Sequence, residues 1–579
     1  AHVRKRAAGL PVARRLPLDM IRVRRYTGLV LRSPARPVAL SALACLTIAC
    51  GEPTPPPADG GTDAGSRADG DAGSPPPGPD VCDELDLPRA PFREGTGADF
   101  HDIAGDFTVE TLDGPWSLST HWSGCESYVF IVYAPNDYGN ALLETYPDAL
   151  FLEGPRNVQY FFASYETDRD AIRERMRALR ATLEEGFDFY EVPAADREFW
   201  RARFHFVTEP IQNSTGSVGD LIRAQPYVQH TLAITREQRF DPLGSLFAFR
   251  SSGTGPDMGM AAWAGLYYDY LFDLHARLAG DGATVVTLID ETDVTARTLD
   301  RTVTLPNAAT MERFDTMEVE VQVHCHLDPA NCSEWDRIAN VQLCLDEACT
   351  DTLEIARWIT PYSRPGLTHW AWDASPFLAL LRDGGQRTFR IVTGPDWEEP
   401  TPADVRVALR LSERGAPRAV GAALAFVGGP FDATYNASHE PFRFTPPADT
   451  TRVELVAIVS GHGMAPPHNC AEWCNHEHAF RVNDGGAHRI DFPEEAGEPL
   501  GCAHRAAEGV PPGQWGNWAH SRAGWCPGFP VHVRRFDLTS EVVVGSENTL
   551  SYEASFMGRE PPGGENVAIV LSAYVVYYR

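Results

Sequence analysis

The change in hydrophobic period near residue 290 constrains the fold of this chain more than any other feature. Before it, apolar runs of strand length, such as 128–133 and 158–163, alternate with segments of helical period. Beyond it, runs such as 317–323 and 405–411 alternate apolar and polar residues with a period of two. Strand–helix alternation indicates a wound α/β sheet, whereas period-two strands between Pro and Gly turns indicate antiparallel sheets. We therefore predict an α/β domain followed by two β-sandwiches.

The α/β domain is expected to span residues 81–290. Its predicted helices lie at 140–150, after a cap at Thr167, and at 258–278. The order of its elements resembles a thioredoxin-like fold. Ala134-Pro135-Asn136-Asp137 occupies the place where such proteins carry Cys-x-x-Cys, so we expect a docking or spacer role and no redox chemistry. Cys125 is expected to pair with Cys82.

The β-rich half is predicted to divide into sandwiches at 291–415 and 416–579. Charge limits the partners of the whole chain. The formal net charge is −29, but residues 1–50 carry about +9, which leaves near −38 for the rest. A protein that binds nucleic acid needs a basic face to displace counterions, so nucleic acid is not expected as a partner.

Residues 1–50 have the pattern of an export signal, with an Arg-rich stretch followed by a short apolar run. The run ends in Leu46-Thr47-Ile48-Ala49-Cys50, which resembles a bacterial lipoprotein signal and implies lipidation of Cys50. The alternative is an ordinary secretory signal. Residues 51–80 are rich in Pro, Gly, Ala and Asp and are expected to form a disordered tether. We expect an exported protein, lipid-anchored to the bacterial cell envelope or outer membrane, or otherwise secreted.

Eight of the twelve cysteines lie in local pairs. Cysteines spaced in this way are either disulfides in an oxidising compartment or metal ligands. The spacings lack the paired Cys-x2-Cys knuckles of a zinc ribbon, so disulfides are favoured. The pairs are Cys325/Cys332, Cys344/Cys349, Cys470/Cys474 and Cys502/Cys526.

Two of these pairs enclose or adjoin a carboxylate next to a tryptophan. The first cluster is Cys332-Ser333-Glu334-Trp335-Asp336-Arg337, and the second is Cys470-Ala471-Glu472-Trp473-Cys474. A carboxylate with a tuned pKa can move protons in hydrolysis, and Trp335 and Arg337 are expected to shift the pKa of Asp336 in opposite directions. We interpret the two clusters as halves of one site.

These clusters, together with 354–362, 459–463, 517–518 and 522–528, resemble the bacterial peptide-N-glycosidase F amidases over about residues 300–579. The resemblance implies two jelly rolls, N-glycoproteins or glycopeptides as substrates, and hydrolysis of the Asn side-chain amide to release the intact glycan and leave Asp. No cofactor or metal is implied. Three cysteine pairs, Cys325–Cys332, Cys470–Cys474 and Cys502–Cys526, match the disulfides of the family, and Cys344/Cys349 is an addition.

The resemblance also implies roles for individual residues. Asp336 is the principal catalytic residue, acting through water, and Glu472 is the second essential acid. A third acid of the family has no Glu in register here, and Asp396 is its candidate replacement. The implied substrate-binding residues are Trp335, Arg337, Trp397, Trp473, Arg522 and Trp525.

Two other functions remain open. The His-x-His pairs His324/His326 and His476/His478 place both rings on one strand face, as in copper enzymes that hydroxylate peptides on related jelly rolls. A copper-dependent peptide monooxygenase is therefore one alternative. The incomplete third acid makes a non-catalytic glycan-binding lipoprotein the other.

Overall fold

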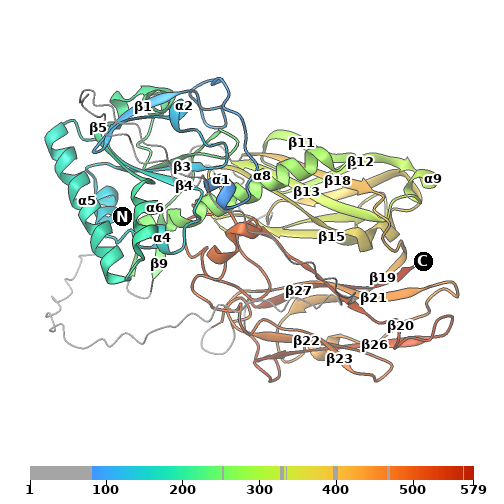
Figure 1. The fold of residues 1–579 in the computed structure, drawn as a ribbon. Coiled ribbons are helices and arrows are strands. Elements are labelled where there is room, and N and C mark those ends of the chain that lie inside the picture. The colour runs from blue at the N-terminus through green and yellow to red at the C-terminus, as the bar shows by residue number, and fades with distance from the viewer. Residues whose placement is uncertain are drawn as a thin grey trace, which may run out of the picture. The chain divides into compact units, whose positions relative to one another are not determined.

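The computed structural model describes residues 81–250, 253–325, 332–333, 335–395, 402–465, 470–564 and 566–579 (Figure 1). The expected signal, tether and Cys50 lie outside this range. The chain divides at residue 76, and everything below concerns the unit 77–579. Within the described ranges, no helix has both the length and the apolar character that a bilayer crossing requires.

An eight-stranded mixed sheet organises residues 81–280. Its order is β2-β1-β5-β4-β3-β7-β8, with β6 paired to β1. β3 and β4 are parallel, as are β4 and β5, whereas β7 is antiparallel to β3. The strands are β1 (Phe107–Thr111), β2 (Gly114–Ser117), β3 (Ser127–Tyr133), β4 (Val158–Ser164), β5 (Phe204–Pro210), β6 (Thr215–Gly216), β7 (Thr231–Ile234) and β8 (Phe240–Asp241). We call this region the α/β unit.

The helices of the α/β unit correct the predicted boundaries. The segment expected as one helix at 140–150 forms two, because Pro147 cannot donate an interior helical hydrogen bond. The cap of α5 is Asp168, not Thr167, and its carboxylate accepts from the amides of Asp170 and Ala171. The predicted closing helix starts as a 3-10 turn, η2 (Met258–Trp263), and continues as α8. The helices are α1 (Val81–Glu84), α2 (Leu118–His121), α3 (Asp137–Leu143), α4 (Ala149–Leu152), α5 (Arg169–Phe189), α6 (Ala194–Arg201), α7 (Ser217–Ala224) and α8 (Ala264–Gly280).

The first sandwich consists of one four-stranded sheet, of order β11-β18-β13-β16, and one five-stranded sheet, of order β12-β17-β14-β15-β24. β11 pairs with β18 from Thr284 onward, so the first sandwich begins there and not at residue 291. Its elements are β11 (Thr284–Val294), β12 (Thr298–Asn307), α9 (Ala308–Met311), β13 (Thr316–Cys325), β14 (Ile338–Cys344), β15 (Thr352–Ile359), β16 (Gly366–Asp373), β17 (Gly384–Val392) and β18 (Ala403–Ser412).

The second sandwich has sheets ordered β19-β27-β21-β25 and β20-β26-β22-β23. One strand from this half of the sequence, β24, instead pairs with β15 of the first sandwich and so joins the two. The strands are β19 (Ala419–Pro430), β20 (Phe442–Phe444), β21 (Arg452–His462), β22 (His476–Val482), β23 (Ala487–Ile490), β24 (Phe529–Pro530), β25 (Val533–Asp537), β26 (Asn548–Phe556) and β27 (Ala568–Tyr578). The protein is thus multidomain and mostly built of jelly-roll-type β sheets, as predicted.

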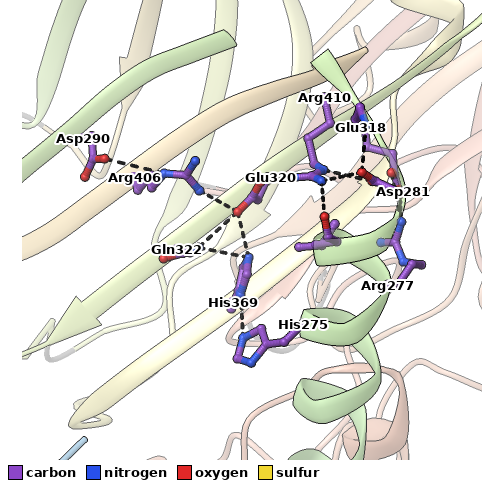
Figure 2. Close-up of polar contacts among 12 residues, drawn as sticks. His275, Arg277, Asp281, Asp290, Glu318, Glu320, Gln322, His369, Arg406 and Arg410 are labelled. Atoms are coloured by element: carbon purple, nitrogen blue, oxygen red, sulfur yellow. Dashed lines mark hydrogen bonds and ion pairs between the residues drawn. The ribbon is translucent and has the colours of Figure 1, made fainter. Parts of the chain in front are cut away.

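Helix α8 lies along the outer face of the first sandwich (Figure 1), close to β16, and its side chains and carbonyls bond to β13 and β18. The period of two in β13 predicts one exposed face, but residues 317–321 are buried on both faces because α8 covers the outer one. Glu320 is at the centre of this contact (Figure 2). It accepts hydrogen bonds from Arg406 at 2.6 Å and Arg410 at 2.8 Å, and Arg410 also donates to the Leu278 carbonyl of α8 at 2.7 Å.

The described cysteines form five disulfides. The four local pairs are bonded as predicted, and Cys82 is bonded to Cys125. Disulfides of this number are typical of proteins that fold in an oxidising compartment, which agrees with export.

Candidate active site

The first acidic cluster lies directly ahead of β14. The Cys325–Cys332 disulfide closes the loop before it. The amide of Arg337 donates to the Thr360 hydroxyl at 2.8 Å, and the Thr360 amide donates back to the Arg337 carbonyl at 2.9 Å. These bonds join the start of β14 to the end of β15. They fix the backbone of Asp336 at the end of the sandwich.

The second cluster is a turn closed by the Cys470–Cys474 disulfide. The Glu472 amide donates to the carbonyl of Gly463 at 3.2 Å, and the Gly463 amide donates to the Glu472 carboxylate at 3.2 Å. The Glu472 carbonyl accepts from the Ala523 amide at 2.9 Å. Glu472 is therefore tied to the end of β21 and to the segment that carries Arg522.

Arg522 joins the two carboxylates, and its side chain is 0% exposed. Its Nη2 atom lies 3.4 Å from Asp336 Oδ2, and its Nε atom lies 3.6 Å from Glu472 Oε1. Asn517 accepts from the guanidinium at 2.8 Å through its side chain and at 3.0 Å through its carbonyl, and the His520 carbonyl accepts at 2.6 Å. The two sequence clusters thus meet at one buried cation.

Tryptophans enclose this guanidinium. The Cζ atom of Arg522 lies 4.3 Å from the ring centroid of Trp473 and 5.1 Å from that of Trp525. Trp525 is 3% exposed and donates to the Gly461 carbonyl at 2.7 Å. Trp525 and Arg522 are both buried, and their expected part in substrate binding stays a prediction. Trp335, at 47% exposed, remains open to a ligand.

The surroundings raise the pKa of both carboxyl groups. Burial raises the pKa of Asp336 to about 7, and the negative charge of Glu472 adds to the rise. Three groups lower this pKa: the charge of Arg522, the hydrogen bond from Tyr362 and the charge of Arg337. Burial also raises the pKa of Glu472, with Arg522 opposing. Arg337 lowers the pKa of Asp336, as predicted, but the main countercharge is Arg522. A carboxyl group with a pKa near 7 can accept and return a proton at neutral pH.

Sequence reasoning missed two residues of this site. The Tyr362 hydroxyl accepts from Arg522 Nη2 at 3.3 Å and hydrogen-bonds to Asp336, and Asn517 orients the same guanidinium. Both occur inside stretches that carry the family resemblance. A phenol or an amide has no spacing signal of its own, so only the fold reveals these roles.

Other predicted residues are either outside the described part of the chain or in the second sandwich. Asp396, Trp397, Glu334 and His326 lie outside the described residues, so the third acid stays a prediction. His476 and His478 lie within the second sandwich, where their facing ring nitrogens are 2.7 Å apart and His478 also contacts the Tyr552 hydroxyl at 2.7 Å. Burial lowers the pKa of both imidazoles.

Within the described ranges, a group of three potential metal ligands occurs in one place, at Asp300, Cys344 and Cys349. The two cysteines are bonded to each other there, which removes their thiolates as ligands. The His pair in the second sandwich is hydrogen-bonded internally, so no described observation favours the copper alternative.

Known proteins resemble the C-terminal part of the chain. Residues 431–576 match the family model described as peptide-N-glycosidase F, C terminal. The chain is 28% identical over 281 residues to peptide-N(4)-(N-acetyl-beta-D-glucosaminyl)asparagine amidase F of Elizabethkingia miricola, covering 42% of this chain and 69% of that protein.

Among solved structures, a peptide-N(4)-(N-acetyl-beta-D-glucosaminyl)asparagine amidase is 24% identical, with 51% of this chain and 96% of that chain covered and a TM-score of 0.41. The glycosylasparaginase PNGase F of Flavobacterium meningosepticum is 22% identical, with coverages of 52% and 96% and a TM-score of 0.40. In sequence, the C-terminal part of this chain is therefore similar to the peptide-N-glycosidase F family.

Proposed function

We propose that the protein is a peptide-N-glycosidase, which hydrolyses the side-chain amide of a glycosylated Asn and releases the intact glycan. The observation that carries the proposal is the pair of carboxylates, Asp336 and Glu472, bridged by the buried Arg522 in a chain similar to this family. The substrates are N-glycoproteins or N-glycopeptides.

Ionised Asp336 takes a proton from a water molecule, whose oxygen attacks the amide carbon. The tetrahedral intermediate then expels the nitrogen, which receives the proton held by Asp336 and leaves as a glycosylamine. The Asn becomes Asp, so one water is consumed and every proton is accounted for. A pKa of about 7 allows Asp336 to serve in both steps.

The remaining residues orient the reactants. Glu472 positions the sugar attached to Asn or shares the proton transfer. Trp335 offers its exposed indole to the C–H face of a pyranose, with Arg337 beside the ring at 5.8 Å. Arg522 keeps both carboxylates in place, and its enclosure by Trp473 limits their access to water. Asp396 and Trp397 complete the expected set.

The direct test is Asp336→Asn on a denatured N-glycoprotein. Release of glycan, read by mass spectrometry, is expected to fall by at least about 10²-fold, the usual contribution of a positioned acid–base group. Asp383→Asn, at a side chain that is 95% exposed, is the matched control and keeps wild-type activity. Wild-type protein that binds the glycoprotein and leaves its glycans attached would instead establish the glycan-binding alternative.

Measuring the Tm of Asp336→Asn distinguishes a loss of catalysis from a loss of folding. Asp336 has a folded pKa of about 7, above its value of about 3.9 in an unfolded chain, so its ionised form costs stability at pH 8. Asp336→Asn removes this cost. The variant is expected to have a Tm at pH 8 that equals or exceeds that of the wild type while activity is lost.

Two further proposals concern the rest of the chain. A thioredoxin-like ancestry of the α/β unit is supported by its parallel β3, β4 and β5 beside the antiparallel β7 and β8. Anchoring through lipid on Cys50 follows from the signal pattern and is tested by detergent phase partition of the expressed full chain. Cys50→Ser is expected to move the protein to the aqueous phase.

A further inference from the structure

A pair of aromatic side chains beside the candidate active site comes from two different parts of the chain. Trp515 lies on the segment that leads to Asn517 and Arg522, and it is 40% exposed. Phe247 begins β9 (Phe247–Arg250), which pairs with β10 (Gly253–Pro256) in the α/β unit. The two rings are stacked, with centroids 5.0 Å apart and an angle of 29°. Phe247 lies outside the part of the chain that matches the family model.

The backbone beneath this pair is built for close approach. Gly244 and Gly513 both have positive φ, at 101° and 81°. A Cβ on Gly244 would lie 2.2 Å from the Gly513 carbonyl oxygen, and one on Gly513 would lie 1.8 Å from the Leu243 carbonyl oxygen. The Ser245 amide donates to the Gly513 carbonyl at 2.6 Å. Only glycine at both places permits this contact, which holds Phe247 against Trp515.

The same segment is fixed to the candidate catalytic residues. The Trp515 amide donates to the Tyr362 carbonyl at 3.2 Å, and the Tyr362 amide donates to the Gln514 side chain at 2.9 Å. Tyr362 in turn contacts Arg522, and its ring lies 6.4 Å from that of Trp335. Backbone hydrogen bonds therefore connect the Trp515–Phe247 pair to Tyr362, whose ring lies next to that of Trp335, beside Asp336.

We propose that Trp515 and Phe247 form an outer carbohydrate subsite, which holds sugar rings of the N-glycan beyond those nearest the Asn. The proposal rests on the proposed function. A glycan is the occupant that this geometry favours, because the C–H face of a pyranose ring packs on an indole, and Trp515 and Trp335 are two exposed indoles joined through Tyr362. A rigid aromatic surface also loses little side-chain entropy on binding. The α/β unit thereby contributes to glycan selection.

Two glycopeptides with one peptide sequence test this subsite. One carries the complete N-glycan and the other only the two sugars nearest the Asn. Trp515→Ala is expected to raise KM for the complete glycan roughly tenfold, equivalent to about 1.4 kcal/mol, with kcat little changed. KM for the trimmed substrate is expected to stay close to that of the wild type. Phe247→Ala acts in the same direction with a smaller effect.

Three comparisons keep the result specific. Trp515→Phe keeps an aromatic face and is expected to restore most of the affinity for the complete glycan. Phe189→Ala, at a ring that is 78% exposed on α5, is the control and changes neither substrate. Wild-type protein is expected to prefer the complete glycan in kcat/KM.

Other outcomes overturn the subsite. Equal losses on both substrates with Trp515→Ala would assign the residue to loop positioning or to peptide contact. Unchanged KM for both substrates would show that no sugar reaches the pair. Wild-type protein that releases glycan from neither substrate would contradict the proposed function itself, which distinguishes that failure from failure of the subsite.

Discussion

At the residue scale, the site depends on the balance of charge around one guanidinium. Arg522 has two carboxylate neighbours, and its cationic form is held in a buried position by Asn517 and the His520 carbonyl. Burial nevertheless raises the pKa of Asp336 to about 7. A single countercharge shared between two acids leaves one of them able to bind a proton at neutral pH.

The pH dependence of hydrolysis follows from this balance. We expect kcat/KM to rise with pH through an apparent pKa near 7, because only ionised Asp336 accepts a proton from water. Glu472→Gln is expected to move this apparent pKa downward, since the negative charge of Glu472 raises the pKa of Asp336. The residual activity of that variant is measured as a pH–rate profile.

Glu498→Gln serves as the matched control, because Glu498 is not among the groups that shift the pKa of Asp336. It is expected to leave the profile in place. An activity that falls as pH rises through 7, or an upward shift with Glu472→Gln, would contradict the assignment of Asp336 as the base.

The place of the two acidic residues in the site was predictable from sequence, because each has an aromatic neighbour. The burial of a tryptophan by a distant strand was not predictable. Asp336 and Glu472 were predicted to share a site, and Arg522 brings them together. Trp525 was predicted to bind sugar because indole suits pyranose rings, yet its position under β21 buries it. Period and composition do not reveal which face of a loop tryptophan the second sandwich covers.

At the element scale, the contact between α8 and β13 decides how the α/β unit and the first sandwich are joined. Glu320 is 3% exposed and has Arg406, Arg410 and His369 as partners. Arg277 of α8 pairs with Glu318 of β13 at 2.7 Å. The outer face of this sheet is therefore an ionic interface, not a solvated surface.

Glu320 is expected to stabilise the protein in a pH-dependent way. Its partners hold the pKa of the folded carboxyl well below its ordinary value. The stabilisation is then present above the unfolded pKa of about 4.3 and is lost as pH falls toward the folded pKa. Glu320→Gln is expected to cost about 3–5 kcal/mol at pH 7, because it leaves buried cations unpaired. Unfolding by denaturant at several pH values measures the difference.

Glu291→Gln is the comparison, since Glu291 pairs with Arg301 at an exposed site. That change is expected to cost less than about 1 kcal/mol. A cost for Glu320→Gln that stays constant between pH 7 and pH 3 would contradict the linkage.

The periodicity predicted which segments are strands and which are helices. It did not predict which strand faces are buried or where a helix is interrupted. The period of two located β13 and β18 correctly, but it predicts one solvated face and carries no information about α8 above it. The apolar spacing near residues 140–150 indicated a helix, and Pro147 ends it locally. Tertiary covering and backbone chemistry overrode the pattern in these two cases.

At the scale of the whole molecule, the disulfides have two different consequences. Cys82–Cys125 joins positions 43 residues apart, and Cys470–Cys474 joins positions four apart. Loop-closure entropy assigns about 4 kcal/mol to the longer link and about 2 kcal/mol to the shorter one. The shorter link, however, encloses Glu472.

We expect the two links to separate stability from activity. Removing Cys82–Cys125 with a pair of Ser substitutions is expected to lower the Tm more and to leave kcat/KM largely intact. Removing Cys470–Cys474 in the same way is expected to lower kcat/KM more than the Tm, because the turn that holds Glu472 loosens. Thermal unfolding and glycopeptide hydrolysis on both variants provide the comparison. A larger activity loss from the Cys82–Cys125 variant would contradict it.

The order of the large regions was predictable because the change of period marks it, but the way they join was not. β11 begins at Thr284, inside the region expected to be α/β, and β24 joins the first sandwich from the second half of the sequence. Contacts such as Gly244 with Gly513 involve residues far apart in the chain and leave no local signal. These long-range contacts tie the α/β unit to the candidate active site.

Hydrolysis of a denatured N-glycoprotein in water enriched in heavy oxygen tests the central claim most directly. The account predicts a released glycan with an intact reducing-end pair of sugars and a new Asp at each former glycosylation site, with one heavy oxygen in its carboxylate. Asp336→Asn should yield neither product. Glycoprotein that keeps all its glycans, or that keeps one sugar on an unlabelled Asn, would contradict hydrolysis of the side-chain amide.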